Sequence, residues 1–367
     1  FFSLPPLPVF NGHIATAFAK NNAVTGDRSG AARFAPCCER VIDLYETRKK
    51  RWLSFLFSCL LAFSLITPAW AAEGERTLIP LGKAVGIKLF ADGALVVSLE
   101  GSDTLKVGDL LLKVNDTRVQ STEQLQALLQ KNGSMPVSMQ VRRGERLVTF
   151  TDTPQCGSDG VYRLGAWIRD SMAGIGTLTY YDPQTASYGA LGHGVSGLDG
   201  TQLLMLQSGY LVRASVAEVR TGTRGTPGEL HGIFEVTDAV GTVEKNTTCG
   251  IFGTLSQPKP GEAVQTAPAS AVTTGAAEIL SNVDGEQVQR FSIRIDRVDP
   301  DAKNGRNLLI TVTDEALLAK TGGIVQGMSG SPILQNGKLV GAVTHVLVND
   351  PTMGYGVLIE NMLEMAK

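Results

Sequence analysis

The 367-residue sequence lacks an excess of charge of either sign, because 33 lysines and arginines stand against 35 aspartates and glutamates. It therefore offers no basic surface of the kind that binds nucleic acid. Histidine and cysteine are scarce, with four and five residues, and their spacing is not typical of zinc ligands. We expect neither a metal nor a cofactor. The chain is instead rich in glycine, with 41 residues, and 43% hydrophobic, which suits a turn-rich globular protein of two or three domains.

The sequence has no methionine before Met135, which is unusual for a complete precursor. Basic residues 48–51 precede a mostly apolar run, and Ala69-Trp70-Ala71 follows it as a small-x-small cleavage site. Residues 41–71 are therefore predicted to form a signal peptide or, alternatively, a membrane anchor, although the run is short for a full span. We interpret residues 1–40 as upstream, untranslated sequence. In either case the bulk of the protein is expected outside the cytoplasm.

Only two cysteines, Cys156 and Cys249, follow the predicted signal segment. In an exported protein two such residues can form a disulfide. The alternative is that both stay as free, buried thiols.

Ser329 lies in a glycine-rich stretch, GGIVQGMSGSP at residues 322–332. A serine hydroxyl is a weak nucleophile at neutral pH, so catalysis needs a base within reach and donors aimed at the developing oxyanion. Glycines permit the backbone conformations of such a loop and the close approach of a substrate carbonyl. We predict Ser329 as the nucleophile and the backbone amides of Gly327 and Ser329 as the oxyanion hole. The alternative is a glycine-rich turn between two strands.

His193 stands between two glycines in ALGHG, residues 190–194, and is the candidate general base. Asp314 ends a predicted strand 15 positions before the serine (329 − 314 = 15) and is the candidate acid that orients the imidazole. Alternatively, Asp314 caps the helix that begins after it. The reserve acids are Asp182, Asp199 and Asp350, and the less favoured bases are His231 and His345.

The region from residue 161 to residue 367 is predicted to be rich in strands. Strands over residues 338–346 and 354–359 and a short final helix follow the serine loop. This order resembles the end of a chymotrypsin-like double β-barrel protease. The resemblance implies a serine peptidase domain over residues 161–367.

Residues 78–153 have the pattern of a small α+β domain, with short strands over residues 85–89, 94–97 and 110–114. A helix begins after Ser121, and a hairpin around Arg143-Gly144 closes the domain. The stretch VGDLLLKVND at residues 107–116 resembles PDZ domains attached to bacterial proteases. Such domains bind peptide C-termini or extended segments by β-augmentation. We expect the strand residues Gly86, Ile87 and Lys88 and the helix residues Gln124 and Leu128 to form the groove. The alternative is an unused groove in a domain that serves as a spacer.

The complete order of parts resembles the stage IV sporulation protein B serine peptidase family of endospore-forming bacteria. The resemblance rests on ALGHG and GGIVQGMSGSP, and residues 312–314, 344–346 and 349–352 add to it. It implies His193 as base, Asp314 as its orienting acid and Ser329 as nucleophile. The expected fold class is therefore mainly β, with a PDZ domain followed by a chymotrypsin-like double β-barrel.

The same resemblance implies a protease that is exported across, or anchored to, the cytoplasmic membrane of the forespore and acts in the intermembrane space. Its implied substrate is a membrane-bound regulator whose cleavage releases an intramembrane metalloprotease. Self-cleavage near the N-terminus, with the PDZ domain governing recognition, is implied as well. The alternative from another functional class is a non-catalytic PDZ scaffold with a vestigial protease fold.

Overall fold

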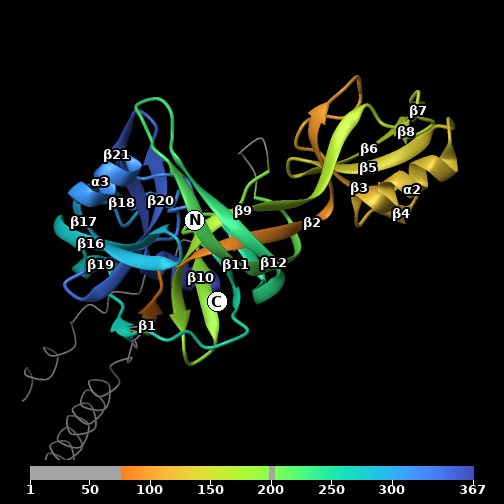
Figure 1. The fold of residues 1–367 in the computed structure, drawn as a ribbon. Helices are drawn as coiled ribbons and strands as arrows, with labels where there is room; N and C mark the ends of the chain where they lie inside the picture. The colour runs from red at the N-terminus through yellow and green to blue at the C-terminus, as the bar shows by residue number, and fades with distance from the viewer. Residues whose placement is uncertain (1–75, 198–202) are drawn as a thin grey trace, which may run out of the picture. The chain divides into compact units, whose positions relative to one another are not determined.

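The computed structural model describes residues 76–197 and 203–367 and is mainly β, as predicted (Figure 1). Residues 1–40 and 41–71, interpreted above as upstream sequence and as a signal or anchor, lie outside the described residues. No helix within residues 76–197 and 203–367 is long and apolar enough to cross a membrane.

Thirteen strands form the larger sheet. They are β1 (Thr77–Pro80), β2 (Ala84–Leu99), β3 (Leu110–Val114), β4 (Thr117–Arg118), β5 (Val137–Arg143), β6 (Arg146–Asp152), β9 (Ala166–Asp182), β10 (Ser187–Ala190), β11 (Leu206–Arg220), β12 (Glu229–Val243), β13 (Lys245–Thr247), β14 (Gly250–Thr254) and β15 (Val264–Gln265). Strands β7 (Gln155–Cys156) and β8 (Tyr162–Arg163) pair separately.

Six further strands close into a barrel in the order β16-β17-β18-β21-β20-β19. They are β16 (Gly275–Asp284), β17 (Gln287–Val298), β18 (Leu308–Val312), β19 (Pro332–Gln335), β20 (Lys338–Leu347) and β21 (Asp350–Leu358). The helices are α2 (Thr122–Asn132), α3 (Glu315–Thr321) and α4 (Ile359–Ala366), with a 3₁₀ turn η1 (Ala269–Ala271). The barrel encloses its own apolar core, whose fully buried members include Ile279, Ile310 and Ile333.

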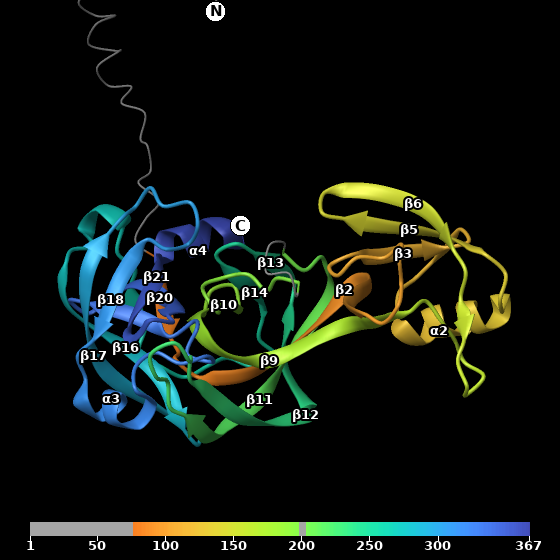
Figure 2. The same ribbon diagram turned by 90° about the horizontal axis from the view of Figure 1, so that it is seen from above.

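Two long neighbouring strands, β2 and β9, connect the barrel part of the larger sheet with the PDZ part (Figure 2). Residues 84–90 of β2 pair with β9 on one edge, and residues 85–91 pair with β11 on the other. Further along, Ala94 and Leu95 pair with β3. The strands predicted over residues 85–89 and 94–97 are thus parts of one strand. We call the part of the larger sheet formed by β1, residues 84–91 of β2, residues 171–182 of β9 and β10 to β15 the half-barrel. Residues 84–90, predicted to belong to the PDZ domain, lie in this half-barrel.

The PDZ part has its own apolar core, in which Leu125 and Leu129 of α2 pack against Val137, Met139 and Val141 of β5. The predicted helix start is confirmed, because the Ser121 side chain accepts a hydrogen bond from the Gln124 amide. This N-cap satisfies one of the amides that lack a partner inside the helix. The hairpin predicted around Arg143-Gly144 is present as β5 and β6.

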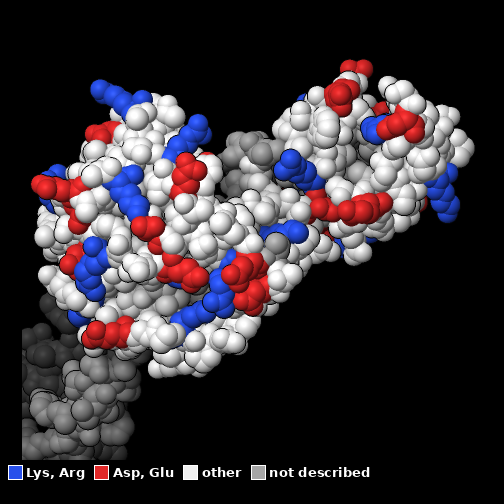
Figure 3. Space-filling view, in the orientation of Figure 1, with Lys and Arg blue, Asp and Glu red and all other residues white. Residues whose placement is uncertain are grey.

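Positive and negative side chains are interspersed on the face of the molecule drawn in Figure 3. The two cysteines of the described part are both free, Cys156 exposed and Cys249 buried. Of the two possibilities left open by the sequence, the structure shows free thiols, of which only Cys249 is buried.

Candidate functional site

Ser329 lies in the loop that joins α3 to β19, at the boundary between the closed barrel and β9. The loop needs its glycines, because Gly327 and Gly330 both have φ values of +98°. A Cβ atom on Gly330 would lie 2.1 Å from the carbonyl oxygen of Thr177, which excludes any side chain there. The glycine pattern noticed in the sequence therefore has a steric cause in the contact between this loop and β9.

The backbone amides of residues 326–331 in this loop divide into two groups. Four of them donate to backbone carbonyls, namely Gln326 to Gly228, Met328 to Val325, Gly330 to Val343 and Ser331 to Met328. Within the described residues, the amides of Gly327 and Ser329 have no acceptor. Two unbonded amides beside a serine are what an oxyanion hole needs, because they can bind an oxygen without first breaking another bond.

The half-barrel holds the loop from its other side through β9. The Thr177 hydroxyl donates to the Gly327 carbonyl over 2.8 Å, and the Thr177 amide donates to the Ser329 carbonyl over 3.0 Å. Both residues whose amides are free therefore have their carbonyl groups fixed. The N–H group of each residue lies in the peptide plane of the preceding carbonyl, so the carbonyls of Gln326 and Met328 orient the two free amides. These carbonyls accept hydrogen bonds from the amides of Leu230 and Ser331, and the bonds from Thr177 hold the next two peptide planes in place.

The hydroxyl of Ser329 donates to the carbonyl oxygen of Thr344, with Oγ and O separated by 2.8 Å. It does not hydrogen-bond to His193 in this structure. Both residues nevertheless line one cavity of about 280 Å³, together with Ile87, Leu89, Met172, Ala173, Gly174, Ile175, Leu191, Val195, Gln326 and Gly327. The structure thus brings the predicted nucleophile and the predicted base to the same pocket.

His193 follows β10 after a tight turn in which Leu191 and Gly192 have positive φ values of 68° and 69°. Its Nδ1 lies 2.9 Å from the Gly194 carbonyl oxygen. A carbonyl only accepts hydrogen bonds, so the contact requires a proton on Nδ1 and leaves Nε2 of the neutral ring free to accept one. Burial lowers the pKa of His193, and the hydrogen bond to Gly194 opposes this effect only in part. The lowered pKa keeps the ring neutral near pH 7.

Asp314, the predicted orienting acid, caps α3 instead. Its two carboxylate oxygens accept hydrogen bonds from the amides of Leu317 and Ser292. The register of the barrel places Asp314 away from the pocket. Tyr355 of β21 pairs with Leu309 of β18 on one side and with His345 of β20 on the other, so Leu309 is the β18 residue level with His345. His345 is the neighbour of His193. Asp314 stands five residues beyond Leu309 (314 − 309 = 5), roughly 15 Å along an extended chain. The alternative of a helix cap, stated from the sequence, is the role that this structure gives it.

His345 contacts the catalytic histidine candidate directly, with the ring centroids of His193 and His345 5.0 Å apart. Its Nδ1 is buried with no hydrogen-bond partner in the described part of the chain. Burial, and then the proximity of His193 and Arg306, lower the pKa of His345 to about 4. Sequence reasoning treated this residue as a less favoured base, and the structure places it as the packing partner of His193.

The other reserve residues lie outside the pocket or outside the described residues. Asp182 accepts from the Gln184 amide in a turn, Asp350 accepts from Thr352 at the end of the β20–β21 hairpin, and exposed His231 pairs with Glu229. Asp199 lies outside the described residues. No carboxylate in residues 76–197 and 203–367 hydrogen-bonds to His193, so these residues show a serine and histidine pair without an acid.

The predicted peptide groove of the PDZ domain is wrong in its strand. Gly86, Ile87 and Lys88 are paired with β9 on one edge and with β11 on the other, so no peptide strand can add to them. A cavity of about 190 Å³ lies instead between α2 and the start of β9. It is lined by Thr122, Leu125, Gln126 and Leu129 of α2 and by Glu100, Arg163, Leu164, Ala166, Trp167 and Ile168, not by the predicted Gln124 and Leu128.

Comparisons with known proteins agree with this architecture. The family model described as SpoIVB peptidase S55 matches residues 160–363, and a PDZ domain model matches residues 104–143. A search of curated proteins found no match.

Among solved structures, the PDZ domain of the SdrC-like protein (Lmo2051) from Listeria monocytogenes is 17% identical over 21% of this chain and 87% of that chain, with a TM-score of 0.20. An inactive form of the Rv3671c protease is 15% identical over 53% of this chain and 82% of that chain, with a TM-score of 0.31. A mutant of Rv3671c from M. tuberculosis H37Rv is 15% identical over 52% of this chain and 80% of that chain, with a TM-score of 0.28. Because the peptidase family model covers more than half of the sequence, the chain belongs to the SpoIVB peptidase S55 family and is a serine peptidase.

Proposed function

We propose that the chain is an endopeptidase in which Ser329 is the nucleophile, His193 is the general base, and the amides of Gly327 and Ser329 bind the oxyanion. The observation that carries the proposal is the pair of amides without acceptors, which lies in the pocket that Ser329 shares with His193. The neutral imidazole, with its proton on Nδ1, presents Nε2 as the proton acceptor.

The reaction begins when the Ser329 hydroxyl turns from the Thr344 carbonyl toward Nε2 of His193. Ser329 Oγ then forms a bond to the substrate carbonyl carbon, its proton passes to His193, and the negative oxygen accepts from the two free amides. His193 gives the proton to the leaving nitrogen as the peptide C–N bond breaks. Water repeats the sequence on the ester, releases the new carboxylate and restores the serine hydroxyl.

We further propose the biological role that the sequence resemblance implies. The enzyme is exported across, or anchored to, the forespore membrane and cuts a membrane-bound regulator of an intramembrane protease, so that sigma-factor processing begins. Membership of the SpoIVB peptidase family supports this proposal. In an endospore-forming host, replacement of Ser329 by alanine is expected to abolish sigma-factor processing on an immunoblot, and unchanged processing would contradict the role.

The test of the chemistry is covalent labelling of the purified chain with a fluorophosphonate probe. We expect wild type to be labelled, and Ser329→Ala not to be labelled. Ser331→Ala is the matched control, because Ser331 is a buried serine of the same loop whose hydroxyl donates to Ser281. Labelling that survives in Ser329→Ala would overturn the assignment, and peptide binding without any labelling would favour the non-catalytic scaffold.

A further inference from the structure

One edge of β9 lies open over most of its length. Its first edge pairs with β2 from Ala166 to Thr177, and β10 takes the second edge only from Leu178 onward. Within the described residues, no strand pairs with the second edge between Ala166 and Gly176. An open strand edge presents unpaired N–H and C=O groups, which are a template for another extended chain.

This edge begins at the catalytic serine. The Thr177 amide faces it, because that amide donates to the Ser329 carbonyl. Every second residue of a strand faces the same edge, so the amides of Ile175, Ala173 and Ser171 face it too. Ala173 and Ile175 also line the cavity that holds Ser329 and His193, so a chain bonded along this edge enters the active site.

The edge ends at the groove of the PDZ domain. Ala166, Trp167 and Ile168 line the cavity against α2, and the Trp167 side chain is 62% exposed there. Between Ser171 and Arg169 the pairing with β2 has a register shift, which moves the alternation along β9 by one residue. Beyond this shift Ile168 faces outward, because its partner Val96 directs its own N–H and C=O groups to Asp109 and Gly108. The same strand therefore serves the PDZ groove at one end and the peptidase pocket at the other.

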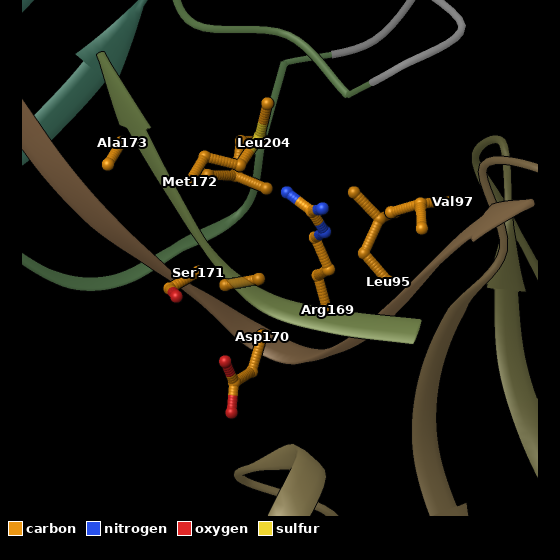
Figure 4. Close-up of a pocket in the computed structure, with 9 residues that line it drawn as sticks. Leu95, Val97, Arg169, Asp170, Ser171, Met172, Ala173 and Leu204 are labelled. Carbon is orange, nitrogen blue, oxygen red and sulfur yellow. The ribbon is translucent and has the colours of Figure 1, made fainter. Parts of the chain in front are cut away.

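A third cavity, of about 280 Å³, fills the interval between these two ends, where Arg169 to Ala173 of β9 face residues of β2 and Leu204. Figure 4 shows the Arg169 side chain extending between Leu95 and Met172, with Asp170 on the opposite side of the strand. The Asp170 carboxylate accepts hydrogen bonds from the amide and hydroxyl of Thr122 at the start of α2, which ties this part of β9 to the helix.

We propose that the open edge of β9 is a continuous binding track on which the polypeptide substrate lies as an added strand from the PDZ groove to Ser329. The proposal rests on the peptidase function proposed above. The nine residue steps from Ala166 to Ile175 (175 − 166 = 9) span about 30 Å, so an occupant needs about ten extended residues. A Cβ atom on Gly174 would meet no atom within 4 Å, so one face of β9 is also open at this residue, which lines the pocket of Ser329. The occupant is therefore an unfolded stretch of protein, because only an extended chain can pair along the edge.

The test compares Ser171→Pro with Ser171→Val in the purified chain. Both side chains are apolar, but only proline removes the outward N–H and so breaks an added strand at the middle of the track. The readout is the ratio of cleavage of unfolded, fluorescently labelled casein to hydrolysis of p-nitrophenyl acetate. An ester this small reaches only Ser329, so the ratio corrects for any loss of folded enzyme.

We expect the casein-to-ester ratio to be about tenfold lower in Ser171→Pro than in Ser171→Val, the effect of losing about 1.4 kcal/mol of strand hydrogen bonding. Equal ratios would overturn the track, and so would a wild type that hydrolyses the ester but leaves casein intact. A wild-type dimer that Ser171→Pro converts to a monomer in sedimentation would show that a second copy covers the edge, which also contradicts the proposal. Failure of the peptidase chemistry itself is distinct, because then wild type would hydrolyse neither substrate.

Discussion

The closed barrel and the half-barrel contribute to the site in different ways. The closed barrel pairs all six of its strands and supplies the serine loop, which its own strand β20 fixes through Val343 and Thr344. The half-barrel supplies His193 and leaves an edge of β9 unpaired among the residues that the structure describes. Closure gives a loop that is fixed before substrate arrives, whereas incomplete closure gives the substrate a strand to pair with. The site needs both the fixed serine loop and the open strand, and each variant below changes a contribution of one barrel or the other.

The largest effect is expected from the histidine of the half-barrel. We expect His193→Ala to lower kcat by roughly 10³-fold or more, because the serine then has no base. The matched control is His231→Ala, an exposed histidine paired with Glu229 outside the pocket, which should retain activity. A similar loss in both variants would show that neither histidine acts as the base.

The second prediction concerns the contact by which the half-barrel holds the serine loop. Thr177→Val keeps the shape of the side chain but removes the donor to the Gly327 carbonyl. We expect the free energy of unfolding in urea to fall by about 1–3 kcal/mol, because a buried acceptor is left unpaired. We also expect kcat to fall, because the backbone between the two oxyanion donors, Gly327 and Ser329, loses one of its anchors.

Thr179→Val is the control for this contact, since the Thr179 hydroxyl donates to Gly330, whose amide is already bonded to Val343. It should lose a similar amount of stability with less effect on kcat. Equal kcat values for the Thr177 and Thr179 variants would mean that the closed barrel alone fixes the oxyanion donors.

The third prediction uses the pH dependence of stability and of activity to distinguish His345 from His193, which lie in contact. The pKa of His345 is lowered to about 4, by burial and by nearby His193 and Arg306, so between about pH 6.5 and pH 4 the unfolded chain binds a proton at this position that the folded chain does not. The free energy of unfolding should therefore be highest above about pH 6.5 and should fall as the pH drops below that value. At pH 5 the expected loss is about 2 kcal/mol. His345→Gln should flatten this slope, and an unchanged slope would show that another group causes it.

The pH dependence of activity should report the protonation of His193. Because burial lowers the pKa of His193, the acid limb of kcat/KM is expected below the ordinary histidine value of about 6.5. A limb above that value would indicate a carboxylate beside the ring, which this structure does not show.

Local features of the sequence predicted local structure well. The glycines around Ser329 and the Ser121 cap each follow from steric or hydrogen-bonding needs within a few residues. Pairings between distant residues were not predictable in the same way. Nothing near Ile87 in the chain signals that Leu211 fills its free edge, and for this reason the peptide groove was assigned to the wrong strand.

The site shows the same limit. The contact of Thr177 with Gly327 joins residues 150 positions apart, and no motif marks it. The spacing of Asp314 from Ser329 fitted an acid in a triad and a helix cap equally well, because spacing does not say toward which end of a strand the site lies. Only the register of β18, β21 and β20 separates the two roles.

The smallest effect is expected from Asp314, and it tests that separation directly. Asparagine is nearly as good an N-cap as aspartate, whereas alanine is not. As a cap, Asp314→Asn should keep both stability and kcat, while Asp314→Ala should lose about 1 kcal/mol in urea unfolding with kcat unchanged. As the acid of a triad, Asp314→Asn would instead lower kcat by roughly 10⁴-fold in a fully stable protein. Since both oxygens of Asp314 are bonded to the amides of Leu317 and Ser292, we expect the first result, which would leave His193 oriented by the Gly194 carbonyl and by its packing on His345.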